Sequence, residues 1–480
     1  MTAPAPAARI SAPQSIDRTK IVCTLGPSSS SPEVISALMD AGLSVARINF
    51  SHGTHESHAR SIALVRQLAT ERGRPVAILG DLQGPRIRIG ELQEPVTVSP
   101  GDEVVLCDEA SATGNDMPVT YTDIARDVKV GDRILVDDGL IEMVVLDIRG
   151  QRVVTRVLHG GEIRSHKGMN LPGVQVSAPS ITEKDRADAQ FAVEQGLDYI
   201  ALSFVRRAED IAALRELLPK GLLVIAKIEK DSALDNIESI VRSADGVMVA
   251  RGDLGVELPF EEVPLVQKSL IRLANQLGRP VITATQMLES MVEHPRPTRA
   301  EASDVANAIL DGTDAVMLSA ETAMGHYPEL SVQAMRRIIA EIERRGVPHR
   351  REERRSGLVG ASTEETIAAA TRTAAVLLGA PLVVVFTKSG FSARIVASQR
   401  PEVPILGLTP VERTFHQLAL IWGVVPALSP QITTYNEMFE YARGEILRRG
   451  LAKQGDRVLV TAGVPFDVPG TTNLLKVEVV

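Results

Sequence analysis

Cysteine is scarce in this sequence, since Cys23 and Cys107 are the only two thiols among 480 residues. Two cysteines cannot build the disulfide framework of a small secreted protein, and free thiols are typical of a reducing compartment. The opening segment MTAPAPAARISAPQS has no long apolar core, so it does not resemble a signal peptide. We therefore expect a cytoplasmic protein whose residues 1–17 form a mobile tail.

The sequence also lacks long apolar runs and an excess of positive charge. Its longest apolar segments, such as APLVVVF, have the length of a strand and are too short to cross a bilayer. With 52 basic and 60 acidic residues, the net charge of -8 gives no field that would attract a nucleic acid. Neither a membrane nor a nucleic acid is expected as a partner.

What is present is the composition of a soluble globular protein, with 44% hydrophobic and 23% charged residues. Short β-branched runs alternate with amphipathic segments of helix length, which is typical of β/α units and a parallel sheet. Eight such runs occur before residue 323, at 19–26, 45–51, 76–84, 199–205, 222–229, 246–253, 280–287 and 315–322. Eight is the number that closes a barrel, so we predict a (β/α)8 TIM barrel over residues 18–86 and 172–345.

The β/α alternation is interrupted once and resumes after the barrel. Residues 87–171 show short alternating strands with turns, which predicts an inserted small β-barrel that could act as a lid. A surface elaboration without function is the alternative reading. Residues 346–362 are highly charged and are interpreted as a linker, and 363–480 predict a C-terminal open α/β domain with a regulatory role.

Polar residues gather at the carboxyl ends of the barrel strands, where barrels of this kind carry their chemistry. Lys227 and Glu229 are two apart, so their side chains leave the same face of a strand. A structural ion pair would explain these two equally well. The next strand adds Asp253, and two carboxylates from adjacent strands suit a hard ion such as Mg²⁺. Gly252 and Gly255 would let backbone amides approach a bound anion beside that metal.

Other strand ends supply further polar groups to the same mouth. Thr285 follows the seventh strand, where a lone threonine is more often a capping residue. The remaining candidates are Arg47, Asn49, Ser51 and His52 after the second strand, Asp81, Arg86 and Arg88 after the third, and Ser319 and Glu321 after the eighth. Phosphoryl transfer would use this mixture, because it is catalysed mainly by positioning and by cations placed on developing charge.

In the last domain, the predicted strand VVVFT runs into KSGFSA and then a helix. Small hydroxyl residues, Gly390 and the free amides of a helix start would converge there on an anion. A plain helix cap at Ser389 or Ser392 is the alternative interpretation.

Ten segments together closely resemble the pyruvate kinase family of bacterial type and occur in the order of that family. They are TKIVCTLGPSS, ARINFSHG, DLQGPRIRIG, VDDGLI, KGMNLPG, AKIE, VARGDLGVELP, TATQMLESM, SAETAMGHYP and GTTNLLKV. The resemblance runs from about Arg18 to Val480. It implies a glycolytic phosphotransferase that uses phosphoenolpyruvate and ADP to give pyruvate and ATP.

The resemblance also implies roles for individual residues. Lys227 would stabilise the transferring phosphoryl group and the enolate, and Glu229 and Asp253 would bind Mg²⁺, with Mn²⁺ as a substitute. The substrate seat would comprise Arg47, Lys227, Thr285 and the amides of Gly252 and Asp253. The nucleotide side would comprise Asn49, His52, Arg88 and Lys167, with Asp138 on the lid. For the proton donor to the enolate, Thr285, Ser319 and Glu321 remain alternatives.

Two regions depart from the family pattern or leave it open. Members that need K⁺ bind it at positions matching Asn49, Ser51, Asp81 and Leu82, near a glutamate that is Arg86 here. Leu82 and Gln83 also replace a threonine and a lysine, so we predict activity independent of K⁺. The loop with Thr387, Lys388, Ser389, Gly390 and Ser392 resembles an effector site for a sugar phosphate or AMP. The family is usually an allosteric homotetramer.

Two other classes of protein remain as alternatives. Another barrel enzyme, a lyase or aldolase acting through an Mg²⁺ enolate, would share the carboxylates but would not need Asn49, His52, Arg88 and Lys167. A catalytically silent regulatory subunit would not need Lys227.

Overall fold

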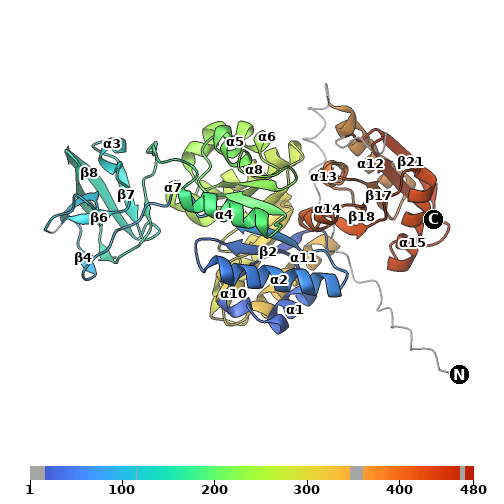
Figure 1. Cartoon of the computed structure of the whole chain (residues 1–480), viewed down its shortest axis with the longest axis horizontal. Coiled ribbons are helices and arrows are strands. Elements are labelled where there is room, and N and C mark those ends of the chain that lie inside the picture. The colour runs from blue at the N-terminus through green and yellow to red at the C-terminus, as the bar shows by residue number, and fades with distance from the viewer. Residues whose placement is uncertain (1–16, 115, 346–360, 465–470) are drawn as a thin grey trace. The chain divides into compact units, whose positions relative to one another are not determined.

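The computed structural model describes residues 17–114, 116–345, 361–464 and 471–480 (Figure 1). The chain divides into two compact units. The first is Ile21–Met335, and the second comprises Arg336–Val480 together with the described residues before Ile21. Most of the predicted linker and of the N-terminal tail lies outside the described residues. Within the described part, no helix combines the length and the apolar character needed to cross a membrane.

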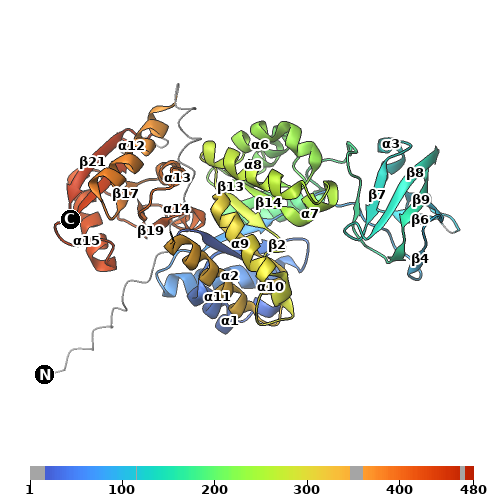
Figure 2. The same cartoon turned by 180° about the vertical axis from the view of Figure 1, so that it is seen from behind.

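The first unit contains a closed parallel barrel of eight strands, which confirms the prediction (Figure 2). Around the barrel the strand order is β1-β16-β15-β14-β13-β12-β3-β2. The strands are β1 Lys20–Leu25, β2 Leu43–Asn49, β3 Ala77–Asp81, β12 Tyr199–Leu202, β13 Leu223–Ile228, β14 Gly246–Ala250, β15 Val281–Ala284 and β16 Ala315–Leu318. All eight predicted runs therefore form barrel strands.

Helices follow the barrel strands in the β/α alternation that the sequence predicted. They are α1 Pro32–Ala41, α2 His55–Glu71, α4 Glu183–Glu194, α5 Ala208–Arg215, α6 Ile237–Ser243, α7 Arg251–Glu257, α8 Val263–Gln276, α9 Arg299–Asp311, α10 Ala320–Ala323 and α11 Pro328–Arg344. Side-chain caps fix several starts: Ser31, Thr54, Thr182 and Thr298 each accept a hydrogen bond from an amide in the first turn.

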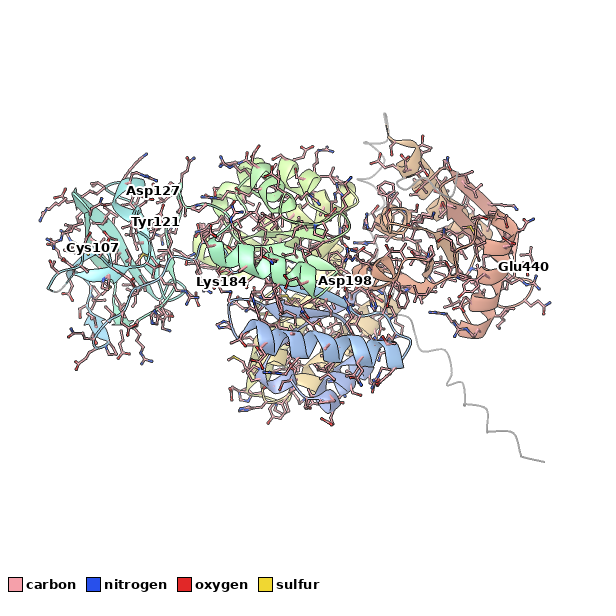
Figure 3. The ribbon with its side chains drawn as sticks, in the orientation of Figure 1. Cys107, Tyr121, Asp127, Lys184, Asp198 and Glu440 are labelled. Atoms are coloured by element: carbon pink, nitrogen blue, oxygen red, sulfur yellow. The ribbon has the colours of Figure 1, made fainter. Side chains whose placement is uncertain are left out.

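A buried polar group also joins strands and a helix at the amino ends of the barrel strands, away from the mouth. Asp198, labelled in Figure 3, precedes β12 and accepts hydrogen bonds from the Ile78 amide at 2.7 Å and from Arg66 at 2.8 Å. This carboxylate joins strand β3 and helix α2 to the start of β12.

Strand register decides which residues meet at the carboxyl ends of the barrel. Arg47 on β2 pairs with Thr24 on β1, and Asn49 pairs with Asp81 on β3. Asp81 in turn pairs with Ala201 on β12. Parallel strands in register bring their polar ends to one level, so these groups lie at a single mouth.

The interrupted segment is an all-β insertion, as predicted. A six-stranded sheet has the order β11-β7-β8-β9-β5-β6, and β4 pairs with β10 in a separate ribbon. The strands are β4 Val96–Val98, β5 Glu103–Asp108, β6 Met117–Val119, β7 Arg133–Val136, β8 Ile141–Arg149, β9 Arg152–His159, β10 Gly161–Ile163 and β11 Met169–Asn170, with one short helix, α3 Ile124–Asp127. One hydrophobic core serves both sheets. Beside it the Tyr121 hydroxyl donates to Asp127 (Figure 3).

The second unit is an open α/β domain with sheet order β19-β18-β17-β20-β21. Its elements are α12 Thr363–Leu378, β17 Val383–Phe386, α13 Phe391–Ser398, β18 Ile405–Thr409, α14 Glu412–Gln417, β19 Val424–Leu428, α15 Tyr435–Arg449, β20 Arg457–Ala462 and β21 Leu474–Val479. The four predicted strands are confirmed. Strand β21 was not predicted, and it pairs antiparallel with β20 at the edge of an otherwise parallel sheet.

The only tryptophan of the chain, Trp422, is buried in this second unit. The guanidinium carbon of Arg400 lies 4.8 Å from the ring centroid, and that of Arg18 lies 5.5 Å from it. Both distances are within the range of a cation–π contact. The indole therefore helps to hold residue 18 against the C-terminal domain.

Candidate active site

Lys227 lies at the end of β13 in the middle of a polar cluster. Its Nζ is 2.8 Å from Glu229 Oε1, 3.2 Å from Asp81 Oδ1 and 2.7 Å from Ser203 Oγ. Burial alone would lower the pKa of Lys227, but the carboxylates of Asp81 and Glu229 outweigh it, and the pKa is raised. The two carboxylates therefore favour the charged form of this buried side chain.

Asp81 joins this cation to a second one. Its Oδ2 accepts a hydrogen bond from Arg47 Nε at 2.7 Å, and Arg47 also donates to Thr24 Oγ1 at 2.9 Å. Burial opposes ionisation of Asp81, but Lys227 and Arg47 lower its pKa below the usual value. The structure thus places two cations, from β2 and β13, around one buried carboxylate.

Glu229 is 1% exposed and accepts a hydrogen bond from the Phe204 amide at 2.6 Å. Burial raises the pKa of Glu229; Lys227 opposes this shift, and the charge of Asp253 in the first turn of α7 adds to it. A cation bound by both carboxylates would relieve this repulsion. Mg²⁺ typically takes one or two protein carboxylates and fills its other positions with water and phosphate oxygens, so the pair fits this ion.

The sequence predicted a metal site from two acidic side chains, and the described residues contain no cluster of three or more histidine, cysteine, aspartate or glutamate side chains that could hold a metal ion. An all-protein cage is therefore not found in this part of the chain.

Thr285 and Gly252 are in contact at the neighbouring strand ends. The Thr285 hydroxyl accepts a hydrogen bond from the Gly252 amide at 2.8 Å and donates to the Ala284 carbonyl at 2.7 Å. Thr285 and Gln286 have φ of 66° and 54°, values that are uncommon for residues other than glycine. Arg251 stabilises this turn by donating to the Thr285 carbonyl at 2.7 Å. The predicted threonine is thus a built part of the mouth, and its hydroxyl also caps the first turn of α7 from the neighbouring strand end.

Ser319 and Glu321 form a separate buried group after β16. Glu321 accepts hydrogen bonds from the Ser319 amide at 2.6 Å and the Leu288 amide at 3.1 Å. Burial raises the pKa of Glu321 above its usual value. The Ser319 hydroxyl is buried and has no hydrogen-bond partner in the described structure. Such an atom is a natural place for an ordered water.

The predicted nucleotide residues lie at the end of β2, where Asn49 is the last residue, and on loops. Asn49 accepts a hydrogen bond from the Ser51 amide at 3.1 Å, and Arg88 donates to the His166 carbonyl at 3.1 Å. Lys167 pairs with Asp137 at 2.9 Å, whereas Asp138, which the sequence singled out, is exposed. Both aspartates have positive φ, so the turn directs their side chains differently. Asp137 was missed because local sequence does not separate two adjacent acids.

Arg86 is exposed, and its guanidinium lies 3.5 Å from the position that a Cβ on Gly168 would take. The ion pairs of Asp81 among the described residues are with Arg47 and Lys227, so Arg86 is not brought to that carboxylate. It borders a cavity beside Asp253 instead. The cavity is lined by Pro85, Arg86, Ile87, Met169, Asn170, Val174, Val176, Phe204, Arg206, Lys230, Ser232 and Asp253.

Three residues of the cluster were not singled out from the sequence: Thr24, Ser203 and Phe204. Ser203 and Phe204 follow directly after β12, and Thr24 lies near the end of β1. Their position at strand ends was a usable signal, because the other candidates were chosen on that basis. The residue types themselves gave no such signal, because neither a lone hydroxyl nor a phenylalanine indicates a phosphate or metal site.

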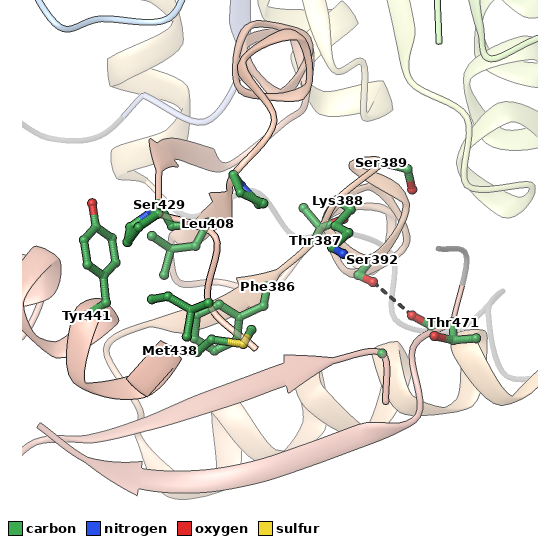
Figure 4. A pocket seen from close by; sticks show the side chains of 14 residues that line it. Phe386, Thr387, Lys388, Ser389, Ser392, Leu408, Ser429, Met438, Tyr441 and Thr471 are labelled. Carbon is green, nitrogen blue, oxygen red and sulfur yellow. Dashed lines mark hydrogen bonds between the residues drawn. The ribbon is translucent and has the colours of Figure 1, made fainter. Parts of the chain in front are cut away.

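The predicted effector loop borders a cavity within the second unit (Figure 4). Helix α13 starts after Gly390, which has φ of 77°, and no side chain caps it. The Ser392 hydroxyl instead bonds to Thr471 and Thr472, so the helix-cap interpretation of Ser389 and Ser392 is wrong. The cavity is lined by Phe386, Thr387, Lys388, Ser389, Ser392, Leu408, Pro410, Ser429, Pro430, Ile432, Met438, Tyr441, Gly463 and Thr471.

Comparisons with known proteins agree with this architecture. The family model described as "Pyruvate kinase, barrel domain" matches residues 16–332, and "Pyruvate kinase, alpha/beta domain" matches 365–478. The chain is 48% identical to a curated pyruvate kinase of Geobacillus stearothermophilus and 45% identical to one of Staphylococcus aureus, in each case over 96% of this chain and 80% of the relative. A crystal structure of a pyruvate kinase from Cryptosporidium parvum superimposes with a TM-score of 0.89 at 35% identity, covering 96% of both chains.

Proposed function

Since the chain belongs to the pyruvate kinase family, we propose that the cluster around Lys227 transfers a phosphoryl group from phosphoenolpyruvate to ADP. In this reaction the bond between phosphorus and the enol oxygen breaks, and a bond between phosphorus and a β-phosphate oxygen of ADP forms. A proton then reaches the methylene carbon and gives pyruvate. The observation that carries the assignment of residues is the meeting of Lys227, Arg47, Asp81 and Glu229 at one mouth.

Lys227 and Arg47 supply fixed positive charge where the reaction develops negative charge. The transferred phosphoryl group carries charge on its three outer oxygens, and the departing enol oxygen becomes an enolate. Two preorganised cations in a buried site stabilise these charges without reorganising water. Asp81 holds both cations at a fixed separation through its two oxygens.

Glu229 and Asp253 would hold a magnesium ion, with Mn²⁺ as a substitute. Bound there, the ion would supply charge stabilisation for phosphoryl and enolate oxygens. The chain's own contribution is to fix Glu229 through the Phe204 amide and to present Asp253 on the first turn of α7. The amides of Gly252 and Asp253, with Thr285, would seat the substrate carboxylate, where Gly252 now bonds to Thr285.

For the final protonation we propose a water-bridged route that uses Ser319, Glu321 and Thr285. Support comes from the unpartnered Ser319 hydroxyl and from the burial of Glu321, which raises the pKa of this carboxyl group and favours its protonated form. Asn49, His52, Arg88, Lys167 and Asp138 are assigned to the nucleotide side, the last three on the β insertion or at its entrance.

Activity without K⁺ is the expected result for this chain, because Arg86 carries a fixed positive charge where members that need K⁺ have a glutamate. We expect turnover in tetramethylammonium buffer to stay within about twofold of turnover with KCl, since a guanidinium keeps its charge at all working pH values. The assay couples pyruvate formation to NADH oxidation. Arg86→Glu should acquire stimulation by KCl, and Arg86→Lys should not. A strong rise of the unmodified enzyme on adding KCl would contradict the proposal.

Regulation through the second unit is a further expectation. We propose that a phosphate group binds at the loop with Thr387, Lys388 and Ser389 beside the cavity of Figure 4. Fructose 1,6-bisphosphate, glucose 6-phosphate and AMP are the probes. One of them should lower the half-saturating phosphoenolpyruvate concentration by about threefold or more, which corresponds to an ordinary allosteric coupling.

Ser389→Asp should abolish that response without changing the basal turnover number, because the added carboxylate repels a phosphate. Thr373→Asp on the exposed face of α12 is the matched control for an added charge. An equal loss of response in both variants, or no response to any probe in the unmodified enzyme, would contradict the effector assignment.

We also propose that the protein is a cytoplasmic homotetramer. Light scattering coupled to gel filtration measures the assembly.

A further inference from the structure

The turn that follows β12, Ser203–Phe204, touches both groups to which the chemistry has been assigned. The Ser203 hydroxyl contacts the Lys227 ammonium at 2.7 Å, and the next residue donates its amide to Glu229 at 2.6 Å. These two consecutive residues follow directly after β12, a strand that itself has no charged residue. The turn is therefore placed to orient the lysine and the carboxylate relative to each other.

The hydrogen bonds of Ser203 fix the direction of its hydroxyl. Its side chain is 2% exposed, and its one proton is donated to the Leu82 carbonyl at 2.7 Å. The oxygen lone pairs are therefore left for Lys227, which can only donate. A hydroxyl polarised in this way is a better acceptor than an isolated one.

The backbone around this hydroxyl is held in place by close packing. Phe204 has φ of 55°, an unusual conformation for an aromatic residue. A Cβ on Gly84 would lie 2.8 Å from the Phe204 ring and 3.1 Å from Ser203 Cβ, so only glycine fits against the turn. The Gly84 amide in turn donates to Asp185 at 3.0 Å. The serine oxygen thus sits on a rigid support.

The Lys227 ammonium donates a hydrogen bond to Ser203 and forms ion pairs with Glu229 at 2.8 Å and with Asp81 at 3.2 Å. A phosphoryl oxygen that binds Lys227 must take over one of these positions. Asp81 and Glu229 have other donors in Arg47 and the Phe204 amide, so either can release the lysine. Ser203 is the neutral acceptor, and retaining it keeps the ammonium attached without lowering its effect on a developing negative charge.

We propose that Ser203 is a positioning residue for phosphoryl transfer, which fixes the direction of the Lys227 ammonium. The inference rests on the role proposed for Lys227. The direction of the ammonium matters most in the transition state, where negative charge develops. Losing Ser203 should therefore lower the turnover number and leave the KM for phosphoenolpyruvate nearly unchanged.

Ser203→Ala is expected to lower the turnover number by about 10- to 100-fold, the range for losing a hydrogen bond to a charged group. The KM for phosphoenolpyruvate should change by less than about threefold. Ser203→Cys keeps the shape of the side chain with a larger atom that is only a weak acceptor, so it should lose a similar part of the turnover number. Steady-state kinetics and thermal unfolding are measured on each variant.

Ser331→Ala is the matched control. Ser331 is 0% exposed and donates its hydroxyl to a backbone carbonyl, that of Tyr327 at 2.9 Å, far along the chain in α11. Both alanine variants should lose similar thermal stability, and only Ser203→Ala should lose turnover. If Ser203→Ala or Ser203→Cys keeps more than half of the normal turnover number, the inference is wrong, as it is if the control loses as much.

The outcome for Lys227→Met separates this inference from the proposed function. If Lys227→Met is active, both the role proposed for Lys227 and the role inferred for Ser203 are wrong. If Lys227→Met is inactive and Ser203→Ala is fully active, only the role inferred for Ser203 is wrong.

Discussion

Lys227→Met is expected to lower the turnover number by about 1,000-fold or more, while phosphoenolpyruvate binding changes by a modest factor. Removing a single preorganised donor from a buried catalytic site already costs about 100- to 1,000-fold. Here the change also removes a full charge, which the carboxylates of Asp81 and Glu229 stabilise against the cost of burial. Binding should be kept because Asp81 still holds Arg47, so this cation of the proposed substrate seat remains in place without Lys227.

The turnover number is measured by the coupled pyruvate assay, and substrate affinity by calorimetry on the inactive variant. Lys268→Met is the control for losing a lysine ion pair, because Lys268 contacts Asp311 at the surface. That variant should keep full activity, as exposed pairs contribute little. Substantial steady-state activity in Lys227→Met would refute the role of the lysine.

Glu229→Gln should give the second largest effect, a loss of metal affinity of at least about 10-fold together with a turnover loss of about 100-fold. Replacing even a group that only supports a metal ligand costs 10- to 100-fold in affinity, so a ligand itself should cost no less. The glutamine keeps an oxygen for the Phe204 amide, so the local fold should persist. Mn²⁺ binding followed by electron paramagnetic resonance measures the affinity independently of activity.

Glu257→Gln is the control for neutralising a buried carboxylate near the same loops. Glu257 ends α7 and accepts a hydrogen bond from Asn170 at 3.0 Å, and the metal role is not assigned to it. Its neutralisation should leave Mn²⁺ affinity unchanged. An equal loss of Mn²⁺ affinity in both variants would contradict the assignment of Glu229. The metal would then bind elsewhere, or the total negative charge near the site would matter more than one ligand.

Periodicity and strand ends allowed the barrel and most of the site to be predicted. The eight strands are continuous buried runs, and a helix-length segment between consecutive strands leaves few alternatives to a parallel barrel. Lys227, Glu229 and Asp253 were found because charge at a strand end is conspicuous in a sequence. Lys227 and Glu229 contact each other because they lie two apart at the end of β13, and Asp253 follows the adjacent parallel strand β14.

Residues that act through others were harder to predict. Ser203 looks like an ordinary polar residue after a strand until Lys227 is seen 2.7 Å from its oxygen, because that contact joins two separate strands. The edge strand β21 was missed for a similar reason, because these residues form a strand by pairing antiparallel with β20. The pairing of Lys167 with Asp137 depends on two successive positive φ angles, which sequence alone did not indicate.

The place of Trp422 has a spectroscopic consequence. Because it is the only tryptophan and lies in the second unit, the indole emission of the whole chain originates in the C-terminal domain. Two guanidinium groups near its ring make that emission sensitive to any shift of Arg18 or Arg400. The enzyme thus carries a built-in optical reporter for events in that domain, because neither the barrel nor the β insertion contains a tryptophan.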